Sequence, residues 1–365
     1  MIHLSRIWDS IQSFLFPWLE EELGQLSPKE EQFVRVCELC DLKRFTASFE
    51  WQGNGRPKAH RLPIAKAFIA KMVYNCANTR VLIDQITRSP SLRRLCGWET
   101  RGDIPSESTF SRAFDEFAHG ELPENIHAAM IELQYNPKLA GHINRDSSAI
   151  EAREKAVPKP KEETKEPSTP PKRGRPKKGE KRDPKVPGRL ELQPDRSLEE
   201  NLFDLPKDCD YGCKKNSNGH KNTWKGYKLH VDVVDGDIPV SVILTSASVH
   251  DSQVAIPLAQ MSEQRVTNLY DLMDAAYDAP EIESFSRQLG HVPIIDDNPR
   301  RGVKKKMEPA ESIRYRERSS VERFFSHLEN YGSKNIRVRG HVKVMAHLMF
   351  GVIVVTAMQI FNLLT

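Results

Sequence analysis

Three acidic residues stand at positions where carboxylates could hold divalent metal ions. Asp146 is predicted to end a strand, Asp274 directly follows a later strand, and Glu322 lies on a late helix. Proteins bind Mg²⁺ through a few carboxylates together with water and phosphate oxygens. Two such ions can activate a water or a 3′-hydroxyl and stabilise the leaving oxygen of a phosphodiester. The three carboxylates are therefore candidates for metal-dependent phosphoryl transfer.

Each of these residues also has an ordinary structural interpretation. Asp146 could close a turn, and Asp274 could cap a helix. Glu322 and Arg318 have the spacing of an i, i+4 surface ion pair. The residue types alone leave both interpretations open.

Other acidic residues near predicted strand ends are interpreted as structural. His250 and Asp251 precede a predicted helix, and we expect Asp251 to cap it. Asp296 and Asp297 follow the last predicted strand and are interpreted as loop residues.

The elements that must position the three carboxylates follow a helical region, residues 1–135. Ile64, Phe68 and Met72 recur at helical spacing, and Gly97 is a typical helix end. A helix with Phe110, Phe114 and Phe117 on one face follows. Short helices joined by tight turns fit a DNA-binding helix-turn-helix and a plain helical bundle equally well.

From Gly141 the pattern changes to strands. Residues 142–150 are predicted as a strand, and 227–234 with 238–245 as a hairpin across Asp235-Gly236-Asp237. A helix (252–261), a strand (266–273), a helix (280–289), a strand (291–295) and a helical end from 312 follow. This order predicts an α/β mixed sheet covered by helices. The expected division is a first strand in 136–154, an insert in 155–200 and the remaining sheet in 201–365.

The insert carries the basic charge of the chain. Thirteen Lys and Arg stand against five Asp and Glu between residues 155 and 189, within a net charge of only +4. With few large apolar residues it is expected to be disordered. Its run Arg173-Gly-Arg175-Pro-Lys177-Lys178 resembles an AT-hook, which lies in a narrow minor groove. The alternative is a flexible linker that touches phosphates without selecting sequence.

Composition limits the class of protein. The chain has 365 residues, enough for two or more domains, and a mean hydropathy of −0.56. Its apolar end, residues 347–364, is predicted to be a buried helix and not a membrane span. Six cysteines without a repeated framework indicate a reducing cytosol, and Cys37 and Cys40 are interpreted as structural residues, with half of a zinc site as the alternative.

Two local motifs give these elements a family resemblance. Tyr315-Arg-Glu-Arg318-Ser-Ser-Val-Glu322 resembles the Tyr-x2-Arg-x3-Glu-x6-Lys signature of a branch of bacterial insertion-sequence DDE transposases. Asp274-Ala-Ala-Tyr-Asp278 is similar to the Asp-x-Gly-Tyr-Asp of the same family. The signature's last position, a Lys, falls on Glu329 here, and Lys334 or Arg323 could supply the missing charge.

The resemblance implies an RNase H-like catalytic domain behind an all-α, DNA-binding N-terminal domain. It implies that Asp146, Asp274 and Glu322 hold two Mg²⁺ ions, which Mn²⁺ can replace, and that Tyr315 and Arg318 support them. The implied partner is double-stranded DNA, both element ends and target. The DNA contacts are expected from Arg318 and Lys334, and from the insert's Arg173, Arg175, Lys177 and Lys178.

The function expected from this resemblance is metal-dependent cleavage and strand transfer of insertion-sequence ends. We expect a homodimer on DNA, in the bacterial cytoplasm with the nucleoid and without a membrane. Two alternatives remain open at this point. One is a catalytically impaired, DNA-binding relative, which Glu329 favours, and the other is an RNase H-like nuclease that cuts without joining.

Overall fold

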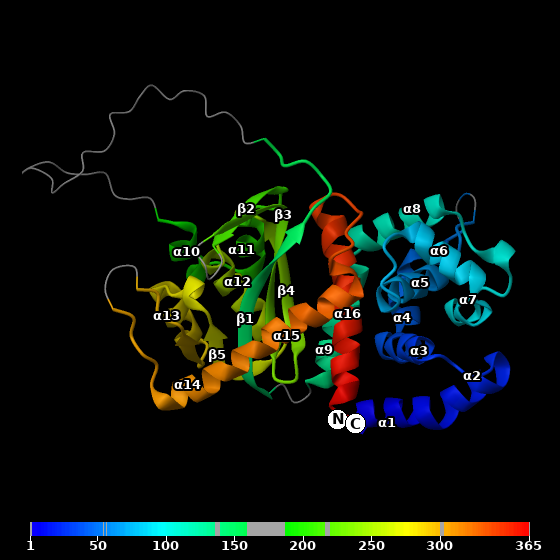
Figure 1. The fold of residues 1–365 in the computed structure, drawn as a ribbon, viewed down its shortest axis with the longest axis horizontal. Helices are drawn as coiled ribbons and strands as arrows, with labels where there is room; N and C mark the ends of the chain where they lie inside the picture. Colours follow the sequence, from blue (N-terminus) through cyan, green and yellow to red (C-terminus); the bar gives the residue numbers. More distant parts are fainter. Residues whose placement is uncertain are drawn as a thin grey trace, which may run out of the picture.

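A computed structural model describes residues 2–53, 55, 57–135, 139–158, 187–215, 220–299 and 303–364. Its N-terminal part is helical (Figure 1). The helices are α1 (Ile2–Ser10), α2 (Phe16–Leu23), α3 (Pro28–Cys40), α4 (Leu42–Thr46), α5 (Arg61–Val73), α6 (Thr79–Arg88), α7 (Pro90–Cys96), α8 (Glu107–His119) and α9 (Leu122–Gln134). The predicted helical spacing is confirmed, because Ile64, Phe68 and Met72 on α5 are all buried.

The second part of the chain is built on a mixed sheet. Its strands are β1 (Leu139–Glu151), β2 (Asp210–Lys215), β3 (Lys221–Val234), β4 (Ile238–Ser246), β5 (Thr267–Met273) and β6 (Val292–Ile295). The order is β2-β3-β1-β5-β6, and β4 pairs with β3. β1, β5 and β6 are parallel, while β3 runs antiparallel to β1, β2 and β4. This is the RNase H-like α/β fold that the family resemblance implied.

Helices cover both faces of the sheet. α10 (Arg189–Leu192), α11 (Leu198–Asp204), α12 (Ser252–Glu263) and α13 (Pro280–Gln288) lie on one face, and α14 (Pro309–Tyr315), α15 (Ser319–Leu328) and α16 (His341–Asn362) on the other (Figure 1). Alternation along β3 produces this division. Leu229 and Val231 face α15 and α16, whereas Asp232 contacts Ser262 of α12.

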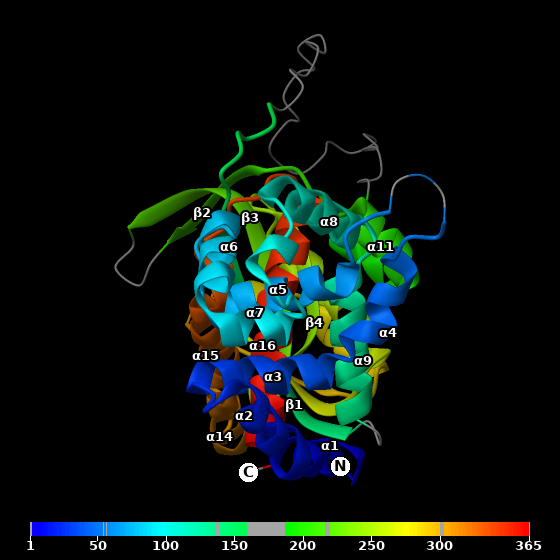
Figure 2. The same ribbon diagram turned by 90° about the vertical axis from the view of Figure 1, so that its right-hand side faces the viewer.

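α16 joins the two parts of the molecule. It lies between the sheet and the N-terminal helices (Figures 1 and 2). Phe350 and Ile353 pack into the helical core, while Leu348 and Val352 pack against β3 and α15. By length and composition α16 could span a membrane, but 83% of its most apolar stretch is buried inside the protein. The structure thus shows the buried core helix expected from the sequence.

Three expectations about boundaries were wrong. β1 does not end at Asp146 but continues to Glu151, because β3 still pairs with it after β5 has ended. The expected insert, 155–200, extends too far, since residues 189–204 contain α10 and α11. Buried Asn201 donates to Gln193 O at 3.0 Å and to Gln260 of α12 at 3.0 Å, so polar contacts order a segment poor in apolar residues. β2 was not predicted, and β3 begins at Lys221, six residues earlier than expected.

Candidate active site

Asp146 and Asp274 lie side by side at the point where β5 leaves the sheet. The last pair in the parallel register of β1 and β5 is Arg145 with Met273. Asp146 directly follows Arg145, and Asp274 directly follows Met273, so the two aspartates are neighbours. Burial raises the pKa of Asp274, and the neighbouring charge of Asp146 raises it further. Two adjacent carboxylates of this kind repel each other unless a cation lies near them.

Asp274 also has the structural role considered for it. Its Oδ1 accepts a hydrogen bond from the Ala276 amide at 2.9 Å and caps the short helical turn Ala275–Tyr277. This bond orients the carboxylate and leaves Oδ2 for another partner. The cap and the proposed metal ligand are therefore compatible roles.

Arg318 connects the first and third candidate carboxylates. Its Nη1 is 3.0 Å from Asp146 Oδ2, and its Nη2 is 2.8 Å from Glu322 Oε1. The pair within the helix is the i, i+4 contact expected from the sequence. The contact with Asp146 spans 172 residues of chain and brings α15 onto β1.

The bridge changes the electrostatics of the site. Burial opposes the charge of Arg318, but Asp146, Tyr315 and Glu322 together raise the pKa of its guanidinium above the ordinary value. Asp146 is only 15% exposed, whereas Glu322 is 61% exposed. The strong half of the bridge is therefore the half that holds Asp146.

Tyr315 ends α14 beside this cluster. The Arg318 guanidinium lies 5.9 Å from the centre of its ring. Burial, together with the charges of Asp296, Asp274 and Asp146, raises the pKa of Tyr315 to about 12 despite the opposing charge of Arg318. Its phenol is therefore protonated at neutral pH and can act as a hydrogen-bond donor.

The rival acidic pair follows β6, next to the site. The Asp296 amide donates to Met273 O at 3.1 Å, so Asp296 continues the row of strand ends that includes Asp274. Its carboxylate is 2.7 Å from Lys304 Nζ, and Asp297 accepts from the Lys305 amide at 2.9 Å. Both aspartates lie in a loop, as expected, and hold its basic residues.

Asp251 does not cap α12, so that interpretation was wrong. Its carboxylate makes no capping hydrogen bond. It accepts from Ser147 Oγ at 2.7 Å and lies 3.0 Å from Lys228 Nζ. The side chain turns toward β1 and β3 because their polar groups supply a cation and a hydroxyl there.

Tyr277 is a neighbour of the site that the sequence pattern did not reveal. It is buried, and its hydroxyl has no hydrogen-bond partner among the described residues. Burial raises its pKa well above the ordinary value, as do the charges of Asp251, Asp146 and Asp274. Its position in the motif Asp274-Ala-Ala-Tyr277-Asp278 is the sequence signal that could have placed it next to the site.

A buried ion pair supports β1 directly beneath the acidic site. Arg145 makes two hydrogen bonds to Asp232 on β3, at 2.8 and 2.7 Å, and both side chains are at most 2% exposed. Ser262 Oγ donates to the same carboxylate at 2.7 Å. This contact fixes β1 against β3 and α12 on the face opposite to Asp146.

Glu329, at the signature's lysine position, forms an ion pair with Lys334. Its Oε2 is 2.5 Å from Lys334 Nζ, and both side chains are about half exposed or more. Arg323, the other candidate for the missing charge, is 2.7 Å from Asp237 instead. Of these two cations, Lys334 is thus the one that lies beside residue 329.

The donor set fits a divalent cation chemically. Carboxylate oxygens are the preferred ligands of Mg²⁺, and Asp146 and Asp274 supply them from adjacent strands. Within the ranges that the structure describes, no three His, Cys, Asp or Glu side chains converge as a metal site. Instead, Arg318 stands as the cation between Asp146 and Glu322. Cys37 and Cys40 are buried, free thiols, and they form no metal site with other described residues.

Several predicted DNA contacts lie outside the described residues. These are Arg173, Arg175, Lys177 and Lys178 of the insert. Arg318 and Lys334 are described, and their partners are the carboxylates named above.

Comparison with known families gives two matches. Residues 198–356 match the family described as Transposase DDE domain, and residues 21–116 match Transposase domain (DUF772). The first match contains Asp274 and Glu322, while Asp146 precedes it. Searches of curated proteins and of solved structures found no match.

Proposed function

Because the chain belongs to the insertion-sequence DDE transposases, we propose that it binds the ends of such an element, cleaves them and joins their 3′-hydroxyls to target DNA. The observation that carries this proposal is the pair of carboxylates Asp146 and Asp274, together with the link from Asp146 through Arg318 to Glu322. The two aspartates are neighbours on parallel strands.

Enzymes of this family typically use divalent metal ions. We propose that Asp146, Asp274 and Glu322 would hold two Mg²⁺ ions, for which Mn²⁺ can substitute. The ions would activate a water or a 3′-hydroxyl and stabilise the leaving oxygen of the phosphodiester. Phosphoryl transfer asks the protein mainly for placement and charge stabilisation.

The chain's own residues supply that placement. Arg318 donates hydrogen bonds to the carboxylates of both Asp146 and Glu322. With DNA bound, its guanidinium would turn from the carboxylates to a phosphate oxygen, which it can contact through two N–H groups. Tyr315, protonated at neutral pH, would donate a hydrogen bond to the same phosphate.

The partner that we propose is double-stranded DNA, bound by a homodimer because both element ends must be held together. Lys334 and the insert's Arg173, Arg175, Lys177 and Lys178 are proposed phosphate contacts. The proposed location is the bacterial cytoplasm, at the nucleoid.

The test is an assay of purified protein on duplexes taken from the DNA that flanks its gene. With Mg²⁺, the wild type is expected to nick and join these ends, and Asp146→Ala is expected to bind them without nicking. Arg323→Gln is the matched control, because Arg323 pairs with Asp237 away from the three carboxylates. Equal activity of wild type and Asp146→Ala would remove Asp146 from the site.

Two further outcomes separate the alternatives. A wild type that binds DNA but does not cut it would identify the catalytically impaired relative, for which Glu329 is the supporting observation. Cutting without joining would identify an RNase H-like nuclease. Both products are resolved on one sequencing gel.

A further inference from the structure

A basic pocket lies where the N-terminal helices meet the sheet domain. Its volume is about 570 Å³. Phe68 and Phe114 line it together with four basic residues, Lys71, Arg80, Arg153 and Arg337. These cations come from α5, α6, the chain just after β1, and the segment before α16. Two parts of the molecule therefore build the pocket together.

Lys71 is buried in this pocket without a carboxylate partner. It is only 5% exposed, and its one described hydrogen-bond partner is the His347 ring, 3.4 Å from Nζ to Nδ1. His347 is neutral, since burial, followed by the charge of Lys71, lowers its pKa to about 3. Burial also lowers the pKa of Lys71, to about 8, so the ammonium is charged at neutral pH. A buried charge without a counter-ion is costly and calls for a ligand.

The rim of the pocket adds further uncompensated positive charge. Arg153 and Arg337 are exposed, and neither has an ion-pair partner among the described residues. Arg80 lies 3.5 Å from Glu107, the single carboxylate that lines the pocket. The N-terminus of α6, capped by Asn78, also faces the pocket and contributes partial positive charge.

We propose that this pocket binds a phosphate group of the DNA backbone, with Lys71 as its buried contact and Arg153 and Arg337 at its rim. The inference rests on the proposed function, and it assigns a DNA contact that joins the helical part to the catalytic part. A phosphate would supply the missing counter-charge, and its oxygens can accept from an ammonium and from guanidinium groups together.

The position of the pocket suits a duplex that also reaches the acidic site. Arg153 follows Asp146 by seven residues on and just beyond β1, a distance of at most about 23 Å at about 3.3 Å per residue. That distance corresponds to about seven base pairs along B-DNA. One bound duplex can therefore place a phosphate in the pocket and another at the carboxylates.

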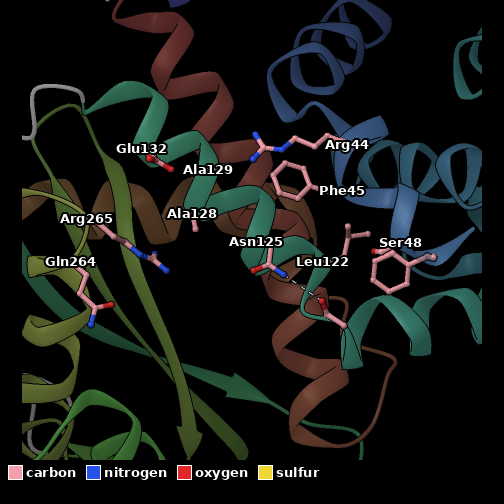
Figure 3. A pocket seen from close by; sticks show the side chains of 12 residues that line it. Arg44, Phe45, Ser48, Leu122, Asn125, Ala128, Ala129, Glu132, Gln264 and Arg265 are labelled. Atoms are coloured by element: carbon pink, nitrogen blue, oxygen red, sulfur yellow. Dashed lines mark hydrogen bonds between the residues drawn. The ribbon is translucent and has the colours of Figure 1, made fainter.

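A second cavity provides the comparison. It has a volume of about 730 Å³ and lies between α4, α9 and the turn that joins α12 to β5 (Figure 3). Arg44 and Arg265 line it from different elements, but Arg265 donates a hydrogen bond to the Val240 carbonyl. Glu132 also lines this cavity and adds a negative charge. Arg44 is thus an exposed arginine in a cavity of mixed charge, suitable as a control.

The test measures binding of a labelled mixed-sequence duplex of about 30 base pairs by fluorescence anisotropy, in EDTA and from about 50 to 200 mM salt. Lys71→Met is expected to weaken binding about tenfold and to lower the slope of log Kd against log salt by about 1. Arg153→Gln with Arg337→Gln is expected to weaken binding and to lower the slope by at most about 1, because these arginines contact the same phosphate as Lys71. Arg44→Gln should leave both unchanged.

Melting temperatures separate a phosphate site from a structural lysine. Lys71→Met removes an unpaired buried charge, so the free protein should melt at the same or a higher temperature. If this variant fails to fold, the exposed pair Arg153 and Arg337 decides the question, because their replacement leaves the core intact.

Three results would overturn the proposal. A wild type that binds DNA while the Lys71 and double-arginine variants match its affinity and slope would refute this site and leave the proposed function standing. Inorganic phosphate that raises the melting temperature of the wild type but not of Lys71→Met, with unchanged DNA binding, would assign the pocket to free phosphate. A wild type without any DNA affinity would refute the proposed function itself.

Discussion

Arg318 is expected to compete with metal ions for the carboxylates that it bridges. Replacing it by glutamine removes the cation between Asp146 and Glu322 and leaves a shorter, uncharged polar side chain. Mn²⁺ binding to the free protein should become tighter, because the metal no longer has to displace a guanidinium. Cleavage of DNA should nevertheless fall, since Arg318 is the proposed contact to the phosphate.

The size of the effect follows from the two halves of the bridge. The largely buried contact with Asp146, at 3.0 Å, is worth about 1.5 kcal/mol, as a hydrogen bond between charged groups. The contact with Glu322 adds about 0.5 kcal/mol, because that carboxylate is 61% exposed and screened by water. Together they amount to about 2 kcal/mol, or roughly thirtyfold in the Mn²⁺ dissociation constant.

This constant is measured by titrating the DNA-free protein with Mn²⁺. Binding is detected by calorimetry or by the loss of the electron paramagnetic resonance signal of the free ion. Arg323→Gln, on the same helix but paired with Asp237, is the matched control and should bind Mn²⁺ like the wild type. Weaker Mn²⁺ binding by Arg318→Gln would refute the competition, since it would mean that the guanidinium organises the carboxylates for the metal.

Three further predictions concern stability and DNA binding. Arg145→Met should lower the free energy of unfolding in guanidinium by about 3–5 kcal/mol, because it leaves Asp232 buried without a cation, and adding Asp232→Leu should recover much of the loss. Asp274→Asn should raise the melting temperature by a few degrees at pH 7. The pKa of Asp274 is raised in the folded protein above its ordinary value of 3.8. The wild type therefore loses stability as the pH rises from 3.8 through the raised pKa. The advantage of asparagine should accordingly disappear in acid. Glu329→Gln frees Lys334 and should tighten DNA binding by up to about fivefold in anisotropy, and an unchanged affinity would exclude Lys334 as a contact.

Local patterns in the sequence predicted the elements of the site well. Asp274 follows β5 directly, and the hairpin turns at Gly236. Phe110, Phe114 and Phe117 are buried, because helical spacing indicates which face of a helix is covered. The i, i+4 spacing likewise predicted the contact of Arg318 with Glu322.

Contacts that depend on sheet register could not be predicted from such patterns. Asp146 lies next to Asp274 because the pairing of β1 with β5 ends at Arg145 and Met273. Predicting this requires the relative position of two strands that are more than 120 residues apart in the sequence. The hydrogen bond from Arg318 to Asp146 likewise depends on how segments 172 residues apart in the sequence pack against each other. Asp251 was misinterpreted because a capping position and a position facing Lys228 look identical in sequence.

The central claim, that Asp146, Asp274 and Glu322 share one metal site, is tested most directly by anomalous X-ray diffraction from crystals grown with Mn²⁺. The account predicts a Mn²⁺ peak between the carboxylates of Asp146 and Asp274, with the Arg318 side chain displaced, and loss of that peak in Asp274→Asn. A peak at Asp296 and Asp297, with Asp146 still held by Arg318, would contradict it.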